Sequence, residues 1–333
     1  MKFNLKKNSA YIIAEIGNNH EGSFARAKKM ISLASNAGVN AVKFQTFKAK
    51  NFVFNKEKQR ILNKFELSYD EFEKLKNIAH KNNLNFISTP LDIESAKFLG
   101  KIADAIKISS GDNNFLELIN VCLSFNKHII ISLGLLDHIE TKKILNKLQN
   151  LFFKKKKIKN VSFLHCVTSY PVQYENANLQ RIVNLKKSWP NLKFGYSDHT
   201  LGFAGCLAAR VLGAEIIEKH FTLDKKFSKF RDHALSADED EMKSIVLNIR
   251  KIEKMTKEYS KNLSKDENNN KKIVRRYPFS KRKISKGEKI NYSNIKFLRP
   301  EKPMKPIILE NIIGKKVKRN ISAESIIKKR DLK

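Results

Sequence analysis

The chain has 333 residues, of which 41% are hydrophobic, and its 66 Lys and Arg against 33 Asp and Glu give a formal net charge of +33. This length predicts one large and one small domain, and the apolar fraction is ordinary for a protein with a sizeable core. No apolar stretch approaches the ~18 residues of a membrane span, and the short run after the first lysines contains Glu15, so we expect neither a membrane protein nor a signal peptide. Cys122, Cys166 and Cys206 are far apart and odd in number, which favours a reducing cytoplasm over a disulfide framework.

Eight short apolar runs that are rich in β-forming residues recur along the chain, at 11–16, 41–45, 85–88, 105–108, 128–132, 161–164, 193–196 and 214–218. Segments with helical periodicity separate and follow them, at 25–37, 69–81, 93–98, 116–125, 138–152, 179–187, 203–212 and 238–257. Such alternation, repeated eight times within about 250 residues, is typical of a parallel (β/α)8 TIM barrel. We therefore predict an α/β fold with a TIM barrel over 1–258, and a doubly wound open sheet is the alternative.

The amino-acid composition of the chain changes after the last of these helices. Residues 259–275 are rich in Lys and Asn, lack apolar periodicity and are interpreted as a linker. Residues 276–333 contain two related stretches, around Ile284 and around Ile321, which indicate a duplicated short β-element. We predict a small β-rich domain there, and because it is too small to bury much surface alone, we expect it to dock on another surface.

Polar side chains cluster where the predicted strands end. In a TIM barrel, catalytic groups lie at these carboxyl ends and in the loops that follow them. The chain places there Glu15, Lys43, Gln45, Thr89, Lys107, Ser110, Ser132, Tyr170, Ser197, His199 and His220. The sequence therefore predicts an active site at the mouth of the barrel.

His199 and His220 end the predicted seventh and eighth strands, which are neighbours in a closed barrel. Two imidazoles that face one cavity can hold a first-row divalent ion, with water and substrate oxygens completing its shell. Asp198 and Glu218 are candidates for supporting groups around such an ion. Packing or solvent exposure of the two histidines is the alternative.

Lys43 and Lys107 end otherwise apolar strands, where a lysine is costly unless it is paired. Either they pair with a carboxylate such as Glu15 or they clamp a phosphate or carboxylate of a ligand. Ser110 and Gly111 favour the clamp, since a small turn before a helix exposes backbone N–H groups to an anion. For Glu15 we weigh a general base against a partner of the lysines, and we favour the partner.

Ten segments, taken in order, span nearly the whole chain: AEIGNNHEGS, AVKFQTF, FISTP, IKISSGD, HCVTSYP, GYSDHTLG, IEKHFT, KRKISKGEKI, FLRP and IIGKKVKRNI. As a set they resemble the sialic acid synthases, which include the legionaminic and pseudaminic acid synthases. The resemblance implies a phosphoenolpyruvate-condensing barrel joined to an antifreeze-like (SAF) domain over 276–333. It also implies a domain-swapped homodimer in which the small domain closes the partner's active site.

The resemblance further implies a reaction and its residues. Phosphoenolpyruvate would condense with an open-chain N-acyl hexosamine such as N-acetylmannosamine, with release of phosphate. His199 and His220 would bind Mn²⁺ or Mg²⁺, Glu15 would assist proton transfer, and Gln45, Asp232 and Arg299 would bind the sugar. The positions that match the phosphoenolpyruvate site are Lys43, Thr89, Lys107, Ser110, Ser132, Thr168, Tyr170 and Ser197.

Three hypotheses follow. The first is a nonulosonic acid synthase, and the second is another phosphoenolpyruvate-dependent barrel enzyme that condenses an aldose or an aldose phosphate. The third, motivated by the charge of +33, is a polyanion-binding protein on an inactive barrel. Because the lysines are scattered along helices without aromatic-interleaved basic strips, we expect a solvated basic surface and no specific nucleic-acid partner.

Overall fold

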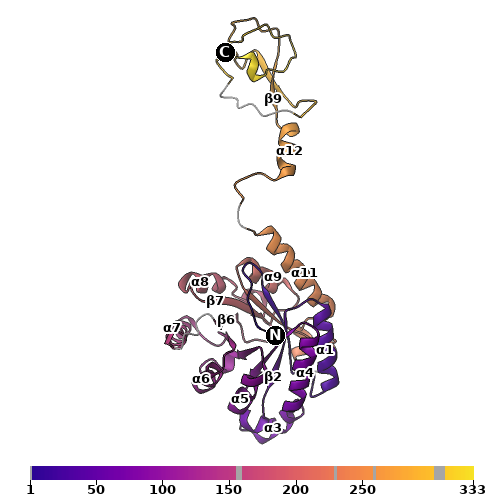
Figure 1. Cartoon of the computed structure of the whole chain (residues 1–333), viewed down its shortest axis with the longest axis vertical. Helices are drawn as coiled ribbons and strands as arrows, with labels where there is room; N and C mark the ends of the chain where they lie inside the picture. Colours follow the sequence, from indigo (N-terminus) through magenta and orange to yellow (C-terminus); the bar gives the residue numbers. More distant parts are fainter. Residues whose placement is uncertain (1, 155–159, 229–230, 258–259, 304–311) are drawn as a thin grey trace. The chain divides into compact units, whose positions relative to one another are not determined.

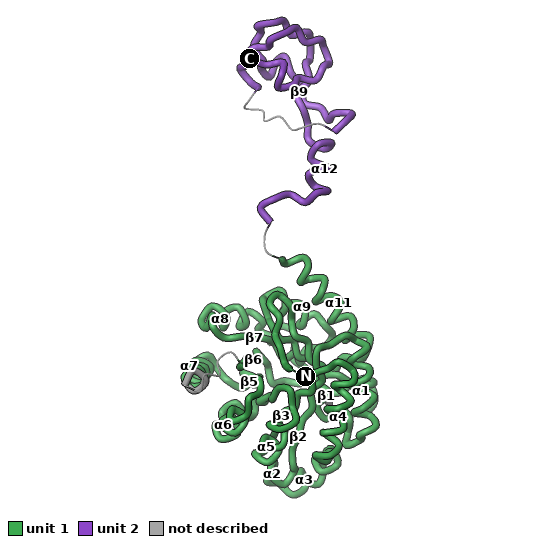
Figure 2. Tube along the Cα trace, viewed as in Figure 1, with its two compact units in different colours: residues 1–257 green, residues 258–333 purple. Residues whose placement is uncertain are grey.

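The structure is a computed structural model that describes residues 2–154, 160–228, 231–257, 260–303 and 312–333. The chain divides into two compact units, Met1–Lys257 and Glu258–Lys333, which Figure 2 shows in different colours. Among the described residues, no helix combines the length and the apolar content of a membrane span. The three cysteines are buried and free.

The first unit is a closed barrel of eight parallel strands, each hydrogen-bonded to the next along the chain, and β8 pairs with β1. Its strands are β1 (Tyr11–Gly17), β2 (Ala41–Thr46), β3 (Asn85–Pro90), β4 (Ala105–Ile108), β5 (His128–Ser132), β6 (Val161–Cys166), β7 (Lys193–Asp198) and β8 (Ile216–His220). The predicted TIM barrel is confirmed, and the doubly wound alternative is wrong. Six strands, β1, β2, β3, β6, β7 and β8, end one or two residues later than predicted. At β7 and β8 the reason is that polar residues, rather than apolar ones, continue the ladder toward the mouth.

Helices surround this barrel, as Figure 1 shows. The predicted helices correspond to α1 (Phe24–Asn36), α4 (Tyr69–Lys81), α5 (Ile93–Ile102), α6 (Leu116–Ser124), α7 (His138–Lys154), α8 (Gln180–Ser188), α9 (Ala204–Val211) and α11 (Glu239–Met255). Short additional helices, α2 (Ala49–Phe52), α3 (Lys56–Asn63) and α10 (Arg231–Leu235), lie in the loops after β2 and β8. They enlarge the mouth side of the barrel and were not predicted.

Two hydrophobic cores follow from the two-residue alternation of strand side chains. On β1, Ile12, Ala14 and Ile16 face outward and join the core between strands and helices, while Tyr11 and Ile13 face inward. The inner core consists of inward side chains of the strands together with Phe3, whose ring lies 4.4 Å from that of Tyr11. The N-terminal segment thus contributes an aromatic side chain to the interior of the barrel.

The second unit contains β9 (Tyr277–Ser280) and β10 (Ile295–Leu298), which form a two-stranded antiparallel sheet. Its core is formed by aliphatic side chains: Ile284, Ile290, Ile295, Ile312, Val317, Ile321, Ile327 and Leu332. The two related stretches of the sequence meet here, since Ile284 and Ile321 form an antiparallel bridge. Within the predicted linker lies a helix, α12 (Lys265–Val274), none of whose residues is buried, so apolar periodicity could not reveal it.

His128 opens β5 and supports a prediction about stability. Its ring stacks on Phe3 with centroids 4.3 Å apart, and its Nε2 bonds with Ser162 Oγ at 2.9 Å. Burial, and then the charge of Lys193, lower the pKa of this imidazole from 6.5 to about 3. Below pH 6.5 the unfolded chain therefore binds a proton here that the folded chain excludes, so stability falls as the pH falls from 6.5 toward 3.

We predict that His128→Gln weakens the pH dependence of the free energy of unfolding in this window by up to about 1.4 kcal/mol per pH unit. Denaturant unfolding at several pH values would measure it. Ser162→Ala is the control, because it removes the hydrogen bond and keeps the imidazole. An unchanged pH dependence in His128→Gln would contradict the assignment.

Candidate active site

A polar layer lies above the inner hydrophobic layer, two residues further along each strand. Because alternate residues of a strand share a face, the side chains that follow Ile13, Ala41, Ala105 and Ile216 by two positions also point into the barrel. This layer consists of Glu15, Lys43, Thr89, Lys107, Ser132, Cys166, Ser197 and Glu218, all of them buried. Six of these were predicted site residues, and the barrel brings them together at its carboxyl end.

Two lysines and two glutamates form the centre of this layer. Lys43 Nζ lies 3.0 Å from Glu15 Oε1, 3.4 Å from Glu218 Oε1 and 3.5 Å from Thr89 Oγ1. Lys107 Nζ lies 3.8 Å from Glu218 Oε1 and donates to Ser132 Oγ at 2.7 Å. Glu218 thus joins both lysines, and the expected pairing of Lys43 with Glu15 is confirmed.

The charges of this cluster depend on one another. Burial would raise the pKa of Glu218, but the ammonium groups of Lys107 and Lys43 hold it below its ordinary value. Burial raises the pKa of Glu15 to about 7 against the opposing charge of Lys43. Burial also lowers the pKa of Lys107, while Glu15 and Glu218 overcome the effect of burial and raise that of Lys43. At neutral pH, Glu218 is therefore ionised and Glu15 is partly protonated.

Glu15 Oε2 and Glu218 Oε2 are buried and accept no hydrogen bond from the described residues. A buried carboxylate oxygen without a donor is costly, so both atoms have unused capacity for a ligand or water. The two oxygen atoms belong to the same carboxylates that pair with Lys43 and Lys107. The cluster can therefore exchange partners when an anion enters.

His199 and His220 form a second group at the mouth. Their ring centroids lie 5.3 Å apart, and the ring of Tyr170 lies 4.2 Å from His199 and 6.1 Å from His220. Glu218 and His220 are two residues apart on β8, so they share a face of the strand. This strand joins the imidazole pair to the lysine cluster.

The imidazoles fit a divalent metal ion. His199 Nδ1 donates to the carbonyl oxygen of Val167 at 2.8 Å, which leaves the lone pair on Nε2. His220 Nδ1 is buried without a hydrogen-bond partner in the described part of the chain, and burial holds the pKa of this imidazole well below its ordinary value. Neutral imidazoles are good ligands for Mn²⁺ and similar ions. Over the described ranges no third His, Cys, Asp or Glu joins them, so water or substrate would complete the shell.

Three loops converge at Gly134, which follows β5. A Cβ atom at this position would lie 2.5 Å from Ser110 Oγ and 2.7 Å from Thr168 Oγ1, so a side chain has no room. Asn113 donates to the carbonyl oxygens of Ser132 and Gly134 and fixes this approach. The predicted residues Ser110 and Thr168 are thus held side by side, with Thr168 exposed at the mouth.

The residues predicted to bind sugar are more dispersed. Gln45 follows Lys43 on β2 and accepts a hydrogen bond from Asn18 at 2.8 Å. Asp232 lies on α10, whose His233 contacts Glu21 of the loop after β1 at 3.3 Å. Arg299 belongs to the second unit, where it is exposed after β10, and its role stays a prediction.

One expectation about supporting groups is wrong. Asp198 faces away from the mouth: its side chain accepts from Thr200 and Cys206 and pairs with Lys219 at 3.0 Å. Glu218 forms ion pairs with the two lysines, and its charge also raises the pKa of His199. The alternation of strand side chains is the reason, since Asp198 immediately precedes His199 and so takes the opposite face.

Lys219 is a residue that the sequence analysis missed. It is fully buried, and with Asp198 it joins β7 to β8 immediately beside both histidines. The signal was present, because SDH and EKH each place a charged residue of opposite sign next to a histidine on neighbouring strands. This ion pair fixes the register that brings His199 and His220 together.

We predict that Lys219→Met destabilises the barrel by about 3 to 5 kcal/mol, because Asp198 is left as an unpaired buried charge. Denaturant unfolding would measure the loss. The double variant Lys219→Met with Asp198→Asn should be less destabilised than the sum of the single variants. Additive losses would show that the pair is not coupled.

Comparisons with known proteins agree with this architecture. Residues 30–261 match the model of the NeuB family, and residues 275–333 match that of the SAF domain. The chain is 37% identical to an N,N'-diacetyllegionaminic acid synthase of Campylobacter jejuni over 95% of this chain and 98% of that protein. It is 30% identical to the human N-acetylneuraminate-9-phosphate synthase over 92% of this chain and 88% of that protein.

A solved structure shows the same fold. The crystal structure of an N-acetylneuraminic acid synthetase from Leptospira borgpetersenii aligns with a TM-score of 0.73 and 32% identity, covering 81% of this chain and 95% of that one. Together with the family match over most of the barrel, this likeness places the chain among enzymes named as synthases. The chain belongs to the NeuB family, the sialic acid synthases and related nonulosonic acid synthases, and carries a C-terminal SAF domain.

Proposed function

We propose that the barrel condenses phosphoenolpyruvate with an open-chain N-acyl hexosamine such as N-acetylmannosamine and releases inorganic phosphate. One observation carries the proposal: a pair of imidazoles and a pair of buried lysines lie at one mouth, joined through Glu218 and His220 on β8. This arrangement suits one divalent ion and one small, highly charged anion next to each other.

The lysine cluster suits the anionic reactant. Lys43 and Lys107 are held in a dry interior, where a phosphate or carboxylate interacts strongly with ammonium groups. Ser110 and Thr168, which Gly134 brings together, would donate hydroxyl hydrogen bonds to the same molecule. Thr89, Ser132, Ser197 and Tyr170 complete the proposed phosphoenolpyruvate site.

The imidazole pair suits the carbonyl reactant. We propose that His199 and His220 hold Mn²⁺ or Mg²⁺, which when bound supplies Lewis-acid polarisation of the sugar aldehyde. Tyr170, beside both rings, lies where the two reactants would meet. Gln45 and Asp232 are the proposed contacts of the sugar hydroxyl groups.

The condensation needs proton transfers that Glu15 can make. C3 of phosphoenolpyruvate attacks the aldehyde carbon, water adds to C2, and the tetrahedral intermediate expels phosphate. Because the pKa of Glu15 is raised to about 7, its carboxyl group can take a proton from the incoming water and return it to a leaving oxygen. Lys43, at 3.0 Å, would keep this carboxyl group in place.

We predict that phosphate release requires phosphoenolpyruvate, an N-acyl hexosamine and Mn²⁺ or Mg²⁺ together, and that EDTA abolishes it. His220→Ala should lower kcat by at least about 100-fold and weaken Mn²⁺ binding, measured by calorimetry. His80→Gln, on α4 and paired with Asp104 outside the barrel, is the matched control. Full activity of His220→Ala would refute the metal site.

A panel of acceptors tests the sugar. N-acetylmannosamine, its 6-phosphate and a diacetamido hexose should be compared with phosphorylated aldoses that carry no acyl group. We expect turnover of at least one N-acyl sugar. Turnover of the simple aldose phosphates alone would instead support another phosphoenolpyruvate-dependent aldolase on the same fold.

We predict that Lys107→Met raises the KM for phosphoenolpyruvate by at least about tenfold, since one charge-assisted contact contributes roughly 1.5 to 3 kcal/mol. The KM for the sugar should change much less. Steady-state kinetics with each substrate varied in turn would measure both. Lys193→Met, at the opposite end of β7, is the control for loss of a positive charge.

A further inference from the structure

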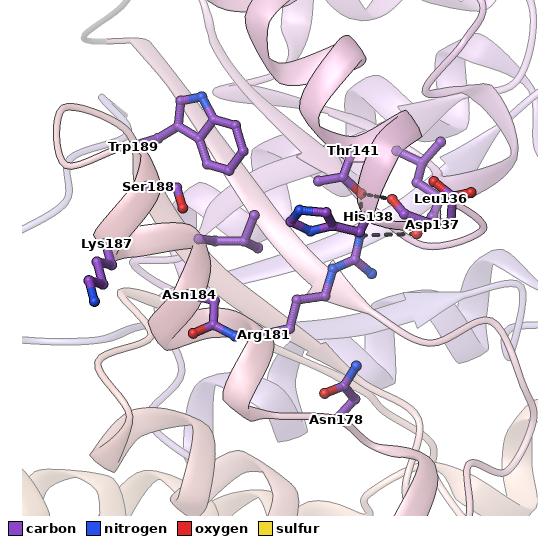
Figure 3. A pocket seen from close by; sticks show the side chains of 11 residues that line it. Leu136, Asp137, His138, Thr141, Asn178, Arg181, Asn184, Lys187, Ser188 and Trp189 are labelled. Carbon is purple, nitrogen blue, oxygen red and sulfur yellow. Dashed lines mark hydrogen bonds between the residues drawn. The ribbon is translucent and has the colours of Figure 1, made fainter.

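A second cavity lies outside the barrel interior, between α7 and α8, and Figure 3 shows it. Its volume is about 720 Å³, which is within the range of small-molecule sites. Its walls carry polar and aromatic side chains from both helices and from the residues that flank α8: His138, Thr141, Asn178, Arg181, Asn184 and Trp189. None of the residues proposed above for the reaction lines it.

Arg181 is the unusual member of this cavity. Its Nη2 donates to the carbonyl oxygen of Leu136 at 3.1 Å and to Thr141 Oγ1. Its Nη1 and Nε donate to no described residue, and no described carboxylate pairs with it. Burial lowers the pKa of this guanidinium, so the cation lies in a poorly solvated place, and it forms no ion pair with a described carboxylate. A guanidinium in this position is suited to bind a carboxylate or phosphate.

Trp189 forms another wall of the cavity. Its indole packs against the outer hydrophobic core, and its Nε1 donates to Asn146 on α7 at 3.2 Å. The ring is therefore fixed between the two helices and is only partly covered. A fixed indole face beside amide groups such as those of Asn178 and Asn184 suits a flat ring with polar substituents.

The remaining charges near the cavity are mixed. Asp137 contributes one carboxylate, but its Oδ1 accepts from the backbone N–H of Glu140 at the start of α7. Lys187 contributes a second cation, which points away from Arg181 in Figure 3. The positive groups thus exceed the negative ones, and the negative one is already engaged.

We propose that this cavity is a second binding site, for a small organic anion that carries a flat ring, and that its occupancy adjusts the proposed phosphoenolpyruvate site. Arg181 binds the carboxylate or phosphate with Nη1 and Nε, and the ring lies against Trp189. Effects on phosphoenolpyruvate rest on the proposed function, whereas binding to the cavity does not.

The connection to the mouth runs through the loop after β5. Arg181 holds the carbonyl oxygen of Leu136, two residues from Gly134, which packs between Ser110 and Thr168. Leu135, between them, has a φ of 61°, a left-handed conformation that a residue with a side chain rarely adopts. An anion that fixes Arg181 therefore also fixes the loop that positions the two hydroxyl groups.

The single tryptophan of the chain gives a direct measurement, because Trp189 emission reports on the cavity alone. Phenyl phosphate, titrated at about 150 mM salt to suppress non-specific attraction, should change this emission saturably. Phenol, which lacks the charge, and inorganic phosphate, which lacks the ring, should each bind at least about tenfold more weakly. Equal responses to all three would overturn the proposal.

Variants test the assignment to Arg181. Arg181→Met should weaken the binding of phenyl phosphate at least about tenfold. Asn184→Asp should weaken it as much, because it places a carboxylate one helical turn from Arg181 at an exposed position. Arg60→Gln, exposed on α3, removes the same charge elsewhere and should bind as the wild type does. Undiminished binding to folded Asn184→Asp, or equal loss in Arg60→Gln, would refute the site.

Kinetics test the connection. Saturating phenyl phosphate should change the KM for phosphoenolpyruvate at least about twofold in the wild type and leave it unchanged in Asn184→Asp at the same concentration. If phenyl phosphate binds and the KM for phosphoenolpyruvate does not change, the link between the cavity and the phosphoenolpyruvate site is refuted. The binding site itself is then still supported. A protein that binds the probe but never releases phosphate would contradict the proposed function instead.

Discussion

The mouth of this barrel depends on mutual neutralisation of buried charges. Four strands each contribute one ionisable group, and Glu218 touches both lysines, so no member of the cluster is left alone in the interior. Each charge would be strongly unfavourable by itself at this depth. The strands must therefore keep their register for the interior to remain stable, and the same register keeps the donors of a ligand site in place.

Asp198 and Lys219 form a second buried ion pair, which lies on the outer side of the sheet. Asp198 and Lys219 are fully buried under α9 and lie next to the two histidines along the chain. Because neighbouring residues of a strand face opposite ways, each strand presents a buried charge outward and an imidazole inward. Stability and ligand geometry at this edge are therefore set by adjacent residues.

The barrel and most of its interior polar layer could be predicted from the sequence. Apolar runs mark strands, and a lysine or glutamate two residues beyond an inward apolar residue, such as Lys43 after Ala41, continues the same face. The ends of β7 and β8 were placed too early, because Asp198 and His220 are polar and interrupt the runs while continuing the hydrogen-bond ladder. Local pattern could not reveal α12, which is stabilised by its Ser264 cap and buries no residue, nor the partners of Asp198, which depend on how α9 packs.

Phe3 has a consequence for the electrostatics at the opposite end. Its ring packs with the inner hydrophobic layer, so the layer below the charged cluster is apolar and closed by an aromatic side chain. Glu15 and the lysines therefore approach solvent on the carboxyl side of the strands, where Thr168 is exposed. A molecule that covers this side removes the remaining solvent, which lowers the local dielectric and strengthens every interaction among the enclosed charges. The apolar layer at one end and a ligand at the mouth would together enclose the charged cluster in a dry interior.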